Sequence, residues 1–341
     1  KRYSVFIISA MRTIHNLFFM EIFYNHYHVK VHITRDDYSY RHIVRTVVLN
    51  ERNGKTIGLM HGAMPVYRNI YAYIYLNSYC IWGKANEIFQ KHLFKHVDKL
   101  EMIGAYRNDF VYNYGPGSET GKIESLRKHY KLVSVFDDIS EDLNPVQLNK
   151  KLFKDSLGEF FCRHGDDLVT RLTLTNRKTL EEFINHIKIL IEKHKDAYFF
   201  IKTKKRGKIL TDRYRQLFKD LPPRYLIIEH TFPTYELIGF SDMVISMSAS
   251  VAVESFCSGT KTIFYDHYND KSKMFPLQKH VEKFTNLIFC HNSKDLFVST
   301  AKILNGVYLD KRTEMQLTEL LGFKFDGKGV ARLREAIRML Y

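Results

Sequence analysis

The stretch of sequence that decides the fold covers residues 232–266 and reads FPTYELIGFSDMVISMSASVAVESFCSGTKTIFYD. Two apolar runs with strand character, Met243–Ser246 and Thr262–Tyr265, flank a segment with helical character. Gly259 stands after that segment, at the position where a glycine commonly ends a helix. The stretch therefore predicts helix, strand, hydroxyl-rich turn, helix and strand, which is the repeating pattern of a parallel α/β sheet.

The same alternation extends outward from this stretch and forms two series. The strands expected in the first series are Val5–Ala10, Val29–Thr34, Thr56–Met60, Ser78–Trp82 and Leu100–Gly104, with helices at Tyr40–Asn50 and Asn86–His96. The strands expected in the second series are Leu132–Phe136, Tyr198–Lys202, Tyr225–Glu229, Met243–Ser246, Thr262–Tyr265 and Leu287–Phe289, with a helix at Thr179–His194. We expect five strands in the first series to make one doubly wound domain. The two series predict an α/β protein with two Rossmann-like domains, whose parallel sheets face a central cleft.

The turn-rich sequence Gly115-Pro116-Gly117-Ser118 separates the two series. We therefore expect an N-terminal domain at 1–116, a C-terminal domain at 117–326 and a C-terminal amphipathic helix at 327–341. That helix is best interpreted as an ordinary packing helix, and the alternative is a basic contact with anionic lipid. Because the chain begins at Lys1 without an initiator Met, it is also expected to be a piece of a longer protein.

Composition narrows the classes of function. The chain has 341 residues and a net charge of +15, which favours anionic ligands such as phosphorylated substrates, nucleic acid or a membrane surface. It carries no recognisable nucleic-acid-binding motif, so no nucleic-acid partner is expected. No apolar stretch approaches the ~20 residues that span a bilayer. The four cysteines are scattered without metal-ligand spacing, so neither a metal site nor a disulfide framework is expected.

Several polar residues follow the expected strands of the first domain, where ligands of such sheets bind. His61 precedes Gly62 after one strand and is placed to act as a general base. Asp37 follows another strand and can share acid–base work with His61, although capping of the next helix is the favoured interpretation. Arg107 and Asp109 follow a third strand and can bind an acceptor or anion, or can simply fix a turn.

The second domain offers candidates for binding a phosphate-bearing donor. Lys202 and Lys204 follow an expected strand, where cations can neutralise a diphosphate leaving group. Ser246, Ser248 and Ser250 lie at the end of a strand and the start of a helix, and exposed N–H groups at such a helix terminus bind anions. The alternative is a plain serine cap without a ligand.

Two further residues of the second domain are candidates for contacts with a nucleotide. Glu254 lies one turn into the helix after the serine-rich turn and can accept hydrogen bonds from a ribose diol. His230 follows the strand expected at Tyr225–Glu229. The alternative for Glu254 is a side chain that faces solvent.

The segment Phe232–Asp266 resembles the donor-binding segment of the teichoic-acid-type CDP-glycerol glycerophosphotransferases and related capsule enzymes. In the first domain, His61-Gly62 and the later Gly104-Ala105-Tyr106-Arg107-Asn108-Asp109 are similar to two elements of that family, in the same order. The resemblance implies a GT-B fold, with His61 as the base and with Ser248, Ser250 and Glu254 holding the donor. Two departures are Lys202-Thr203-Lys204 where the family usually has His-Pro, and Tyr106 where it usually has Pro.

The resemblance implies a transferase that moves a glycosyl or polyol-phosphate group from a CDP-, CMP- or UDP-linked donor to a bacterial surface polysaccharide, such as capsule, O-antigen or teichoic acid. No cofactor is expected beyond the donor itself. A cytoplasmic location, with peripheral contact to the inner membrane face, would suit a lipid-linked acceptor. The alternatives are a nucleotide-sugar epimerase on the same fold and a non-catalytic basic module that binds nucleic acid or membrane.

Overall fold

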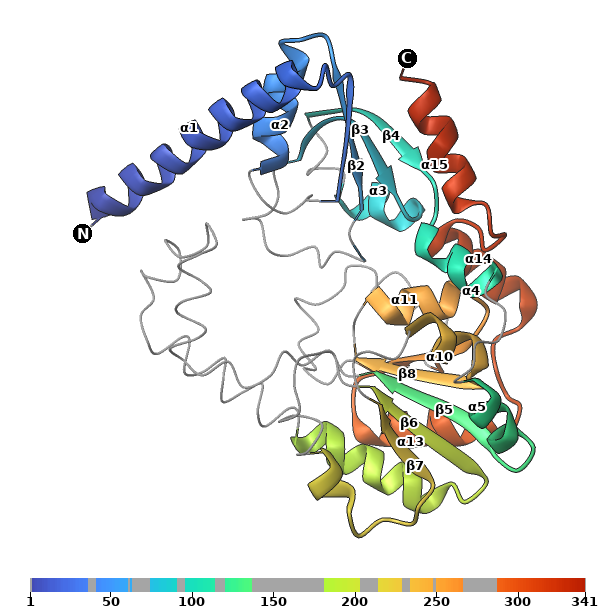
Figure 1. The fold of residues 1–341 in the computed structure, drawn as a ribbon. Coiled ribbons are helices and arrows are strands. Elements are labelled where there is room, and N and C mark those ends of the chain that lie inside the picture. The colour runs from blue at the N-terminus through green and yellow to red at the C-terminus, as the bar shows by residue number, and fades with distance from the viewer. Residues whose placement is uncertain are drawn as a thin grey trace.

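The computed structural model describes residues 2–35, 41–60, 62, 74–90, 96–113, 120–136, 181–202, 214–228, 234–247, 250–265 and 287–340. Within these residues the chain forms two parallel sheets that are accompanied by helices (Figure 1). This architecture confirms the predicted α/β class with two parallel sheets.

The first sheet pairs four described strands in the order in which they occur in the chain. These strands are β1 (Val31–Thr34), β2 (Lys55–Leu59), β3 (Tyr75–Ile81) and β4 (His96–Met102), and the helices of this part are α1 (Arg2–His26), α2 (Arg41–Asn50) and α3 (Lys84–Gln90). The order of the described strands does not reverse, so the doubly wound arrangement expected for this domain is not seen among them.

The strand predicted at Val5–Ala10 is wrong, because these residues belong to helix α1. A short apolar run has no period that separates a strand from a helix. The first Gly or Pro of the chain is Gly54, so no breaker interrupts the helix before its end at His26. The predicted helix Asn86–His96 also runs too far, since His96 begins strand β4.

The second sheet has six described strands in the order β10-β9-β8-β5-β6-β7, so the strand order reverses between β5 and β8. The strands are β5 (Lys131–Phe136), β6 (Ala197–Lys202), β7 (Tyr225–Ile228), β8 (Met243–Met247), β9 (Lys261–Tyr265) and β10 (Phe289–Cys290). A helix at 181–193 and helix α13 (Ser293–Leu304) bury side chains against one face. Helices α5 (Thr120–Arg127), α10 (Thr234–Phe240) and α11 (Ser250–Cys257) lie on the other face.

The last two helices connect the two halves of the molecule. Helix α14 (Lys311–Gly322) contacts both α3 of the first part and α11 of the second. Helix α15 (Gly329–Arg338) then packs on the first sheet, where Ala336 is buried in one cluster with Ile57 and Cys80 (Figure 1). The C-terminal segment is therefore a packing helix in the structure. None of the helices in the described residues has the length and apolar character needed to cross a membrane.

Candidate functional site

Ser246 lies at the carboxyl end of β8, beside the point where the strand order of the second sheet reverses. It pairs in register with Phe136 of β5. The side chain is 0% exposed, and its Oγ has no hydrogen-bond partner among the described residues. Leaving a buried hydroxyl unsatisfied costs about 1–3 kcal/mol, and ligands of such sheets bind at this reversal. Ser246 is therefore a candidate ligand contact.

Lys202 ends β6 at the same level of the sheet. It pairs in register with Phe136, as Ser246 does from the other side, so the two Cα atoms are roughly 10 Å apart, two strand spacings. Side chains at one level of adjacent parallel strands point to the same face. Burial lowers the pKa of the Lys202 ammonium to about 8. An anion bound beside it would compensate for the loss of water around this charge.

The N-terminus of α11 meets the carboxyl end of β2. A Cβ atom placed on Gly62 would lie 2.3 Å from Ser250 Oγ and 3.3 Å from Ser250 Cβ, so the absence of a side chain at this position lets the two segments approach closely. Met60, just before His61 in the sequence, is buried in one cluster with Ala252 and Val253 of α11. The chain on either side of His61 is thus packed against the first turn of α11.

Glu254 joins the two halves of the molecule through polar contacts. Its Oε1 lies 3.4 Å from Arg107 Nη1 and accepts a hydrogen bond from the Tyr235 hydroxyl at 3.3 Å, and its backbone oxygen accepts one from Asn108 Nδ2 at 3.0 Å. Arg107 also lies over the ring of Trp82, with 5.9 Å between its Cζ and the ring centroid. Burial raises the pKa of Glu254 to about 7, while the positive charge of Arg107 opposes the rise.

The expected solvent-facing alternative for Glu254 does not hold, since the residue is 2% exposed. A ribose hydroxyl that bonded Oε1 would have to displace Arg107 or Tyr235. In the structure this carboxylate pairs with an arginine of the first domain, and its predicted contact with a nucleotide stays a prediction.

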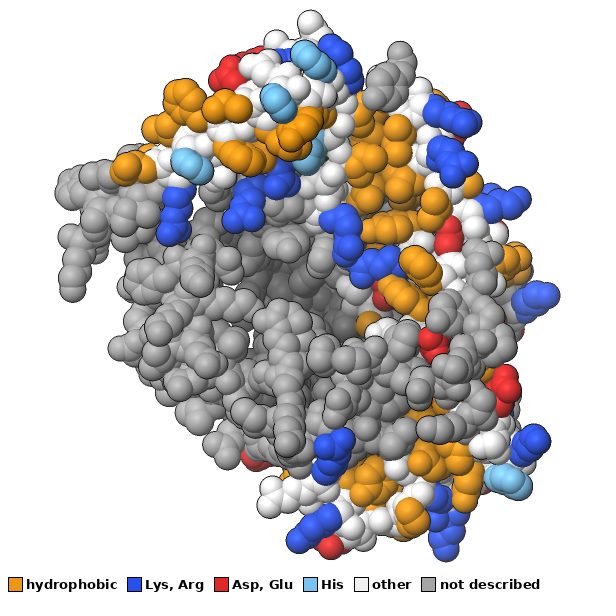
Figure 2. Space-filling model, viewed as in Figure 1, with side chains coloured by type: hydrophobic (Ala, Val, Ile, Leu, Met, Phe, Trp, Pro, Cys, Tyr) orange, Lys and Arg blue, Asp and Glu red, His pale blue; other side chains and the backbone are white. Residues whose placement is uncertain are grey.

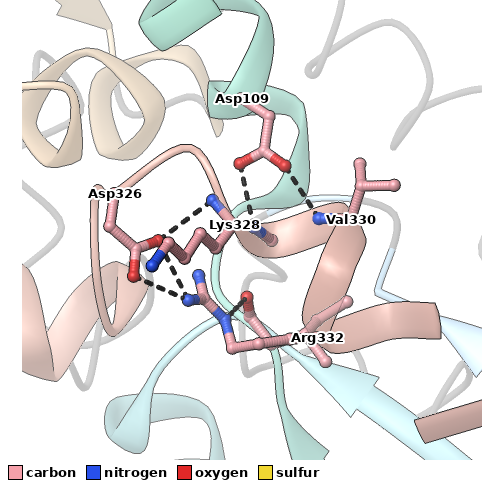
Figure 3. Close-up of polar contacts among 7 residues, drawn as sticks. Asp109, Asp326, Lys328, Val330 and Arg332 are labelled. Carbon is pink, nitrogen blue, oxygen red and sulfur yellow. Dashed lines mark hydrogen bonds and ion pairs between the residues drawn. The ribbon is translucent and has the colours of Figure 1, made fainter. Parts of the chain in front are cut away.

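Asp109 has a structural partner at the other end of the chain. Its two carboxylate oxygens accept hydrogen bonds from the backbone N–H groups of Gly329, at 3.0 Å, and Val330, at 2.7 Å, at the start of α15 (Figure 3). Nearby, Arg332 binds both oxygens of Asp326 and donates from Nε to the carbonyl of Ile103 at 2.9 Å. This group, which we call the α15 clasp, caps a helix through Asp109. The predicted contact of Asp109 with an acceptor or anion stays a prediction.

Five of the predicted site residues lie outside the residues that the structure describes. They are the proposed base His61, its predicted partner Asp37, and the candidate donor ligands Lys204, Ser248 and His230. Within the described part of the chain, no group of three or more His, Cys, Asp or Glu side chains is arranged to hold a metal ion.

Three residues around Glu254 were not singled out from the sequence. Tyr235 lies within the stretch at residues 232–266. Its position in the first turn of α10 is the feature that could have marked it as a site residue. Trp82, the only tryptophan of the chain, directly follows β3. Arg35 directly follows β1, and its positive charge, like that of Arg107, opposes the rise in the pKa of Glu254 that burial causes. All three stand just past a strand or at a helix start, where polar site residues of α/β proteins gather.

The two parallel sheets, with α11 between them, define the GT-B-like class of folds. Residues 24–296 match the family described as "Polysaccharide biosynthesis PFTS motif protein", and the chain belongs to this family. A comparison with curated proteins finds no match.

Solved structures with the same fold include enzymes of more than one activity. A putative UDP-N-acetylglucosamine 2-epimerase from Listeria monocytogenes is 10% identical with a TM-score of 0.61, over 96% of this chain and 78% of that one. A glycosyltransferase from Rickettsia africae is 13% identical with a TM-score of 0.53, over 96% and 80%. The wall teichoic acid polymerase TagF is 11% identical with a TM-score of 0.50, over 91% and 71%. At these identities the likeness shows the fold alone.

Proposed function

We propose that this chain is a transferase that moves a glycosyl or polyol-phosphate group from a nucleotide-activated donor to a growing surface polysaccharide. The observation that carries the proposal is the contact of Gly62 with Ser250, because it brings the His-Gly element of the first domain to the N-terminus of α11. A base and an anion-binding helix end would then lie on the same side of one reaction centre. Membership of a polysaccharide biosynthesis family supports the same class of reaction.

In this proposal the donor diphosphate lies between the N-terminus of α11 and Lys202. Ser246 and Ser250 donate hydrogen bonds to it, Lys204 and Ser248 complete its site, and His230 contacts the nucleotide. The negative charge that grows on the leaving nucleotide is stabilised by the Lys202 ammonium and by the N–H groups of α11, which are fixed before the reaction begins. Glu254 contributes by holding Arg107 in place.

On the acceptor side, His61 removes the proton from an acceptor hydroxyl, and Asp37 shares the acid–base work or caps the neighbouring helix. The deprotonated oxygen attacks the electrophilic carbon or phosphorus of the donor, and the bond to the nucleotide diphosphate or monophosphate breaks. A polymer or lipid-linked acceptor would enter from the first domain. The proposed domain limits remain 1–116, 117–326 and 327–341.

The donor class can be tested by thermal shift with CDP, CMP, UDP and GDP. A ligand that binds only the folded state raises the melting temperature, and a ligand at 100 times its Kd stabilises by about 2.7 kcal/mol. We expect a shift with one of the pyrimidine nucleotides and a loss of that shift in Lys202→Met. If none of the four nucleotides raises the melting temperature, the proposal of a nucleotide-activated donor fails.

The role of His61 can be tested by the His61→Ala variant. Removal of a general base typically costs 10²–10⁴ in rate, so turnover should fall by about that factor while the nucleotide shift is kept. His15→Ala, on the exposed surface of α1, is the matched control and should keep full turnover. Unchanged turnover of His61→Ala would remove this residue from the mechanism.

Product analysis separates the transferase from the epimerase alternative. An epimerase converts its nucleotide sugar without an acceptor, whereas a transferase releases nucleotide only when an acceptor is present. A non-catalytic basic module would instead bind nucleic acid with an affinity that falls steeply with salt.

A further inference from the structure

Helix α1 buries one of its sides within this chain. Leu17, Met20 and Tyr24 pack against Val48 and Leu49 of α2, and Tyr24 is buried. The rest of α1 extends away from the first sheet (Figure 1). One side of α1 is therefore covered by α2 of the same chain.

The opposite side of α1 is also apolar. Met11, Ile14, Phe18 and Ile22 recur at spacings of three and four residues, which places them along one face of a helix, and they are 54–66% exposed. We call these four residues the outer face of α1. They are flanked by the exposed aromatic side chains Phe19, Phe23 and Tyr27, and Figure 2 shows apolar side chains along this helix.

Among the described residues, nothing covers this outer face. A helix that is apolar on two opposite sides is normally buried on both, and monomeric proteins rarely expose a continuous apolar patch of several hundred Å². At ~200 Å² for a large apolar side chain, the outer face exposes roughly 500 Å², or roughly 800 Å² with the flanking aromatic side chains. A standard protein interface buries about 800 Å² on each partner.

The charges along α1 disfavour a lipid surface as the partner. Between Ala10 and Tyr27 the fully charged residues are Arg12 and Glu21, and Glu21 pairs with Arg52 at 2.9 Å. A helix that lies on an anionic membrane carries several Lys or Arg residues along the border of its apolar face. The net charge of +15 thus arises mostly elsewhere in the chain.

We propose that the outer face of α1 packs against the same face of a second copy of this chain. In an antiparallel pair related by a two-fold axis at Phe18, each residue faces the one an equal distance on the other side of position 18. Ile14 of one copy then meets Ile22 of the other, the two Phe18 rings lie in contact at the axis, and Met11 lies opposite Asn25 at each edge of the interface. This self-complementary arrangement is what a two-fold interface requires.

Sedimentation velocity of the full chain, at tens of µM, tests the proposal. The wild type should sediment as a dimer of the 40.4 kDa chain, and Phe18→Asp should sediment as a monomer with an unchanged circular dichroism spectrum. Met315→Asp, at an equally exposed position on α14, is the matched control and should remain dimeric. A monomeric wild type, or a Phe18→Asp variant that stays dimeric, would overturn the proposal.

Cross-linking tests the register independently of the strength of association. Under mild oxidation, Phe18→Cys should form a disulfide-linked dimer, because the two side chains meet at the axis. Met20→Cys, which lies on the side of α1 that packs on α2, should not. Equal cross-linking of both variants would exclude this interface. Flotation of the wild type, but not of Phe18→Asp, with vesicles of anionic lipid would identify a membrane as the partner instead.

Discussion

Two polar regions of this molecule have opposite character: the α15 clasp, where the last helix meets the rest of the chain, and the strand reversal inside the second sheet. In the α15 clasp every carboxylate has matched donors, since Asp109 accepts two backbone N–H groups and Asp326 accepts Arg332 (Figure 3). At the strand reversal of the second sheet, Ser246 Oγ is buried without a described partner, and Lys202 is buried with a lowered pKa.

The difference separates polar groups that hold the fold together from polar groups that are ready for a ligand. The hydrogen-bonded carboxylates of the clasp stabilise the native state, whereas the unsatisfied Ser246 hydroxyl and the partly desolvated Lys202 ammonium cost free energy that a bound anion would offset. Substitutions in the clasp should therefore lower stability and leave activity unchanged. Substitutions at the strand reversal should lower activity and leave stability unchanged, or even raise it.

The largest effect is expected where the two halves meet most closely. In Gly62→Ala the new methyl group would overlap Ser250 Oγ and press on Ser250 Cβ, so the Ser250 hydroxyl must rotate away and the chain around Gly62 must shift relative to α11. A displacement of about 1 Å in a reaction centre can cost 100-fold in rate, and we expect a loss of at least about that size in steady-state turnover.

Gly239→Ala is the control for Gly62→Ala, because its Cβ would make an ordinary contact of 3.7 Å with Val111. Replacing Ser250 by Ala in the Gly62→Ala background removes the nearest clashing atom and should restore part of the activity. Full turnover in Gly62→Ala would show that the contact with Ser250 does not position the reacting groups.

Lys202→Met should change activity and stability in opposite directions. The pKa of Lys202 is lowered from 10.5 to about 8, so the folded state carries a cost below pH 8 that fades as pH rises toward 10.5. Removal of this charge should raise the free energy of unfolding at pH 7 by about 1–3 kcal/mol and weaken nucleotide binding about 30-fold.

Urea unfolding and nucleotide titration check the two effects of Lys202→Met, with the exposed Lys84→Met as control. In the wild type, nucleotide affinity should also fall above pH 8, as the ammonium loses its proton. If Lys202→Met is less stable than the wild type and binds nucleotide normally, Lys202 has a structural role, as the clasp residues do.

Much of the fold could be predicted from local sequence, and much of the site could not. Strands such as Lys131–Phe136 are rich in β-branched and aromatic residues, so each can be predicted from its own short segment of sequence. The contact of Arg107 with Glu254 joins residues 147 positions apart, and that of Asp109 with Val330 joins residues 221 apart. Both depend on how the two domains and the last helix pack, which no local pattern specifies.

The sequence suggested both Arg107 and Asp109 as anion-binding candidates for the same reason, their place after one strand. Their environments differ because the 3₁₀ turn Tyr106–Asn108 directs Arg107 toward α11, while Asp109 begins helix α4 (Asp109–Asn113) beside α15. The residue type and its spacing predicted that both would be polar contacts. Only the packing decided which contact each one makes.

Glu254→Gln should change how stability depends on pH. The folded-state pKa of about 7 lies above the ordinary value of 4.5, so the stability of the wild type is complete below pH 4.5 and is lost as pH rises through 7. The loss should amount to about 3 kcal/mol, because a tenfold change in a protonation equilibrium corresponds to about 1.4 kcal/mol.

Urea unfolding at several values between pH 4.5 and 8 measures this effect. The curve of Glu254→Gln should be nearly flat over the range in which the wild type weakens, and the exposed Glu319→Gln should follow the wild type. Turnover should also fall in Glu254→Gln, because Arg107 loses its charged partner. If the wild-type stability does not decline between pH 5 and 7, Glu254 is not a buried carboxyl of raised pKa.

The smallest effect is expected in the clasp. Asp109→Ala removes a carboxylate that accepts two N–H groups at the start of α15, and loss of a helix cap typically costs about 1 kcal/mol. Turnover should stay within about two-fold of the wild type, because α15 still packs through Ala336 and its neighbours. Asp109→Asn, which keeps one acceptor oxygen, should recover part of the stability. A large loss of turnover with unchanged stability would instead show that Asp109 acts in the acceptor site. The clasp and the strand reversal would then not differ in function as described.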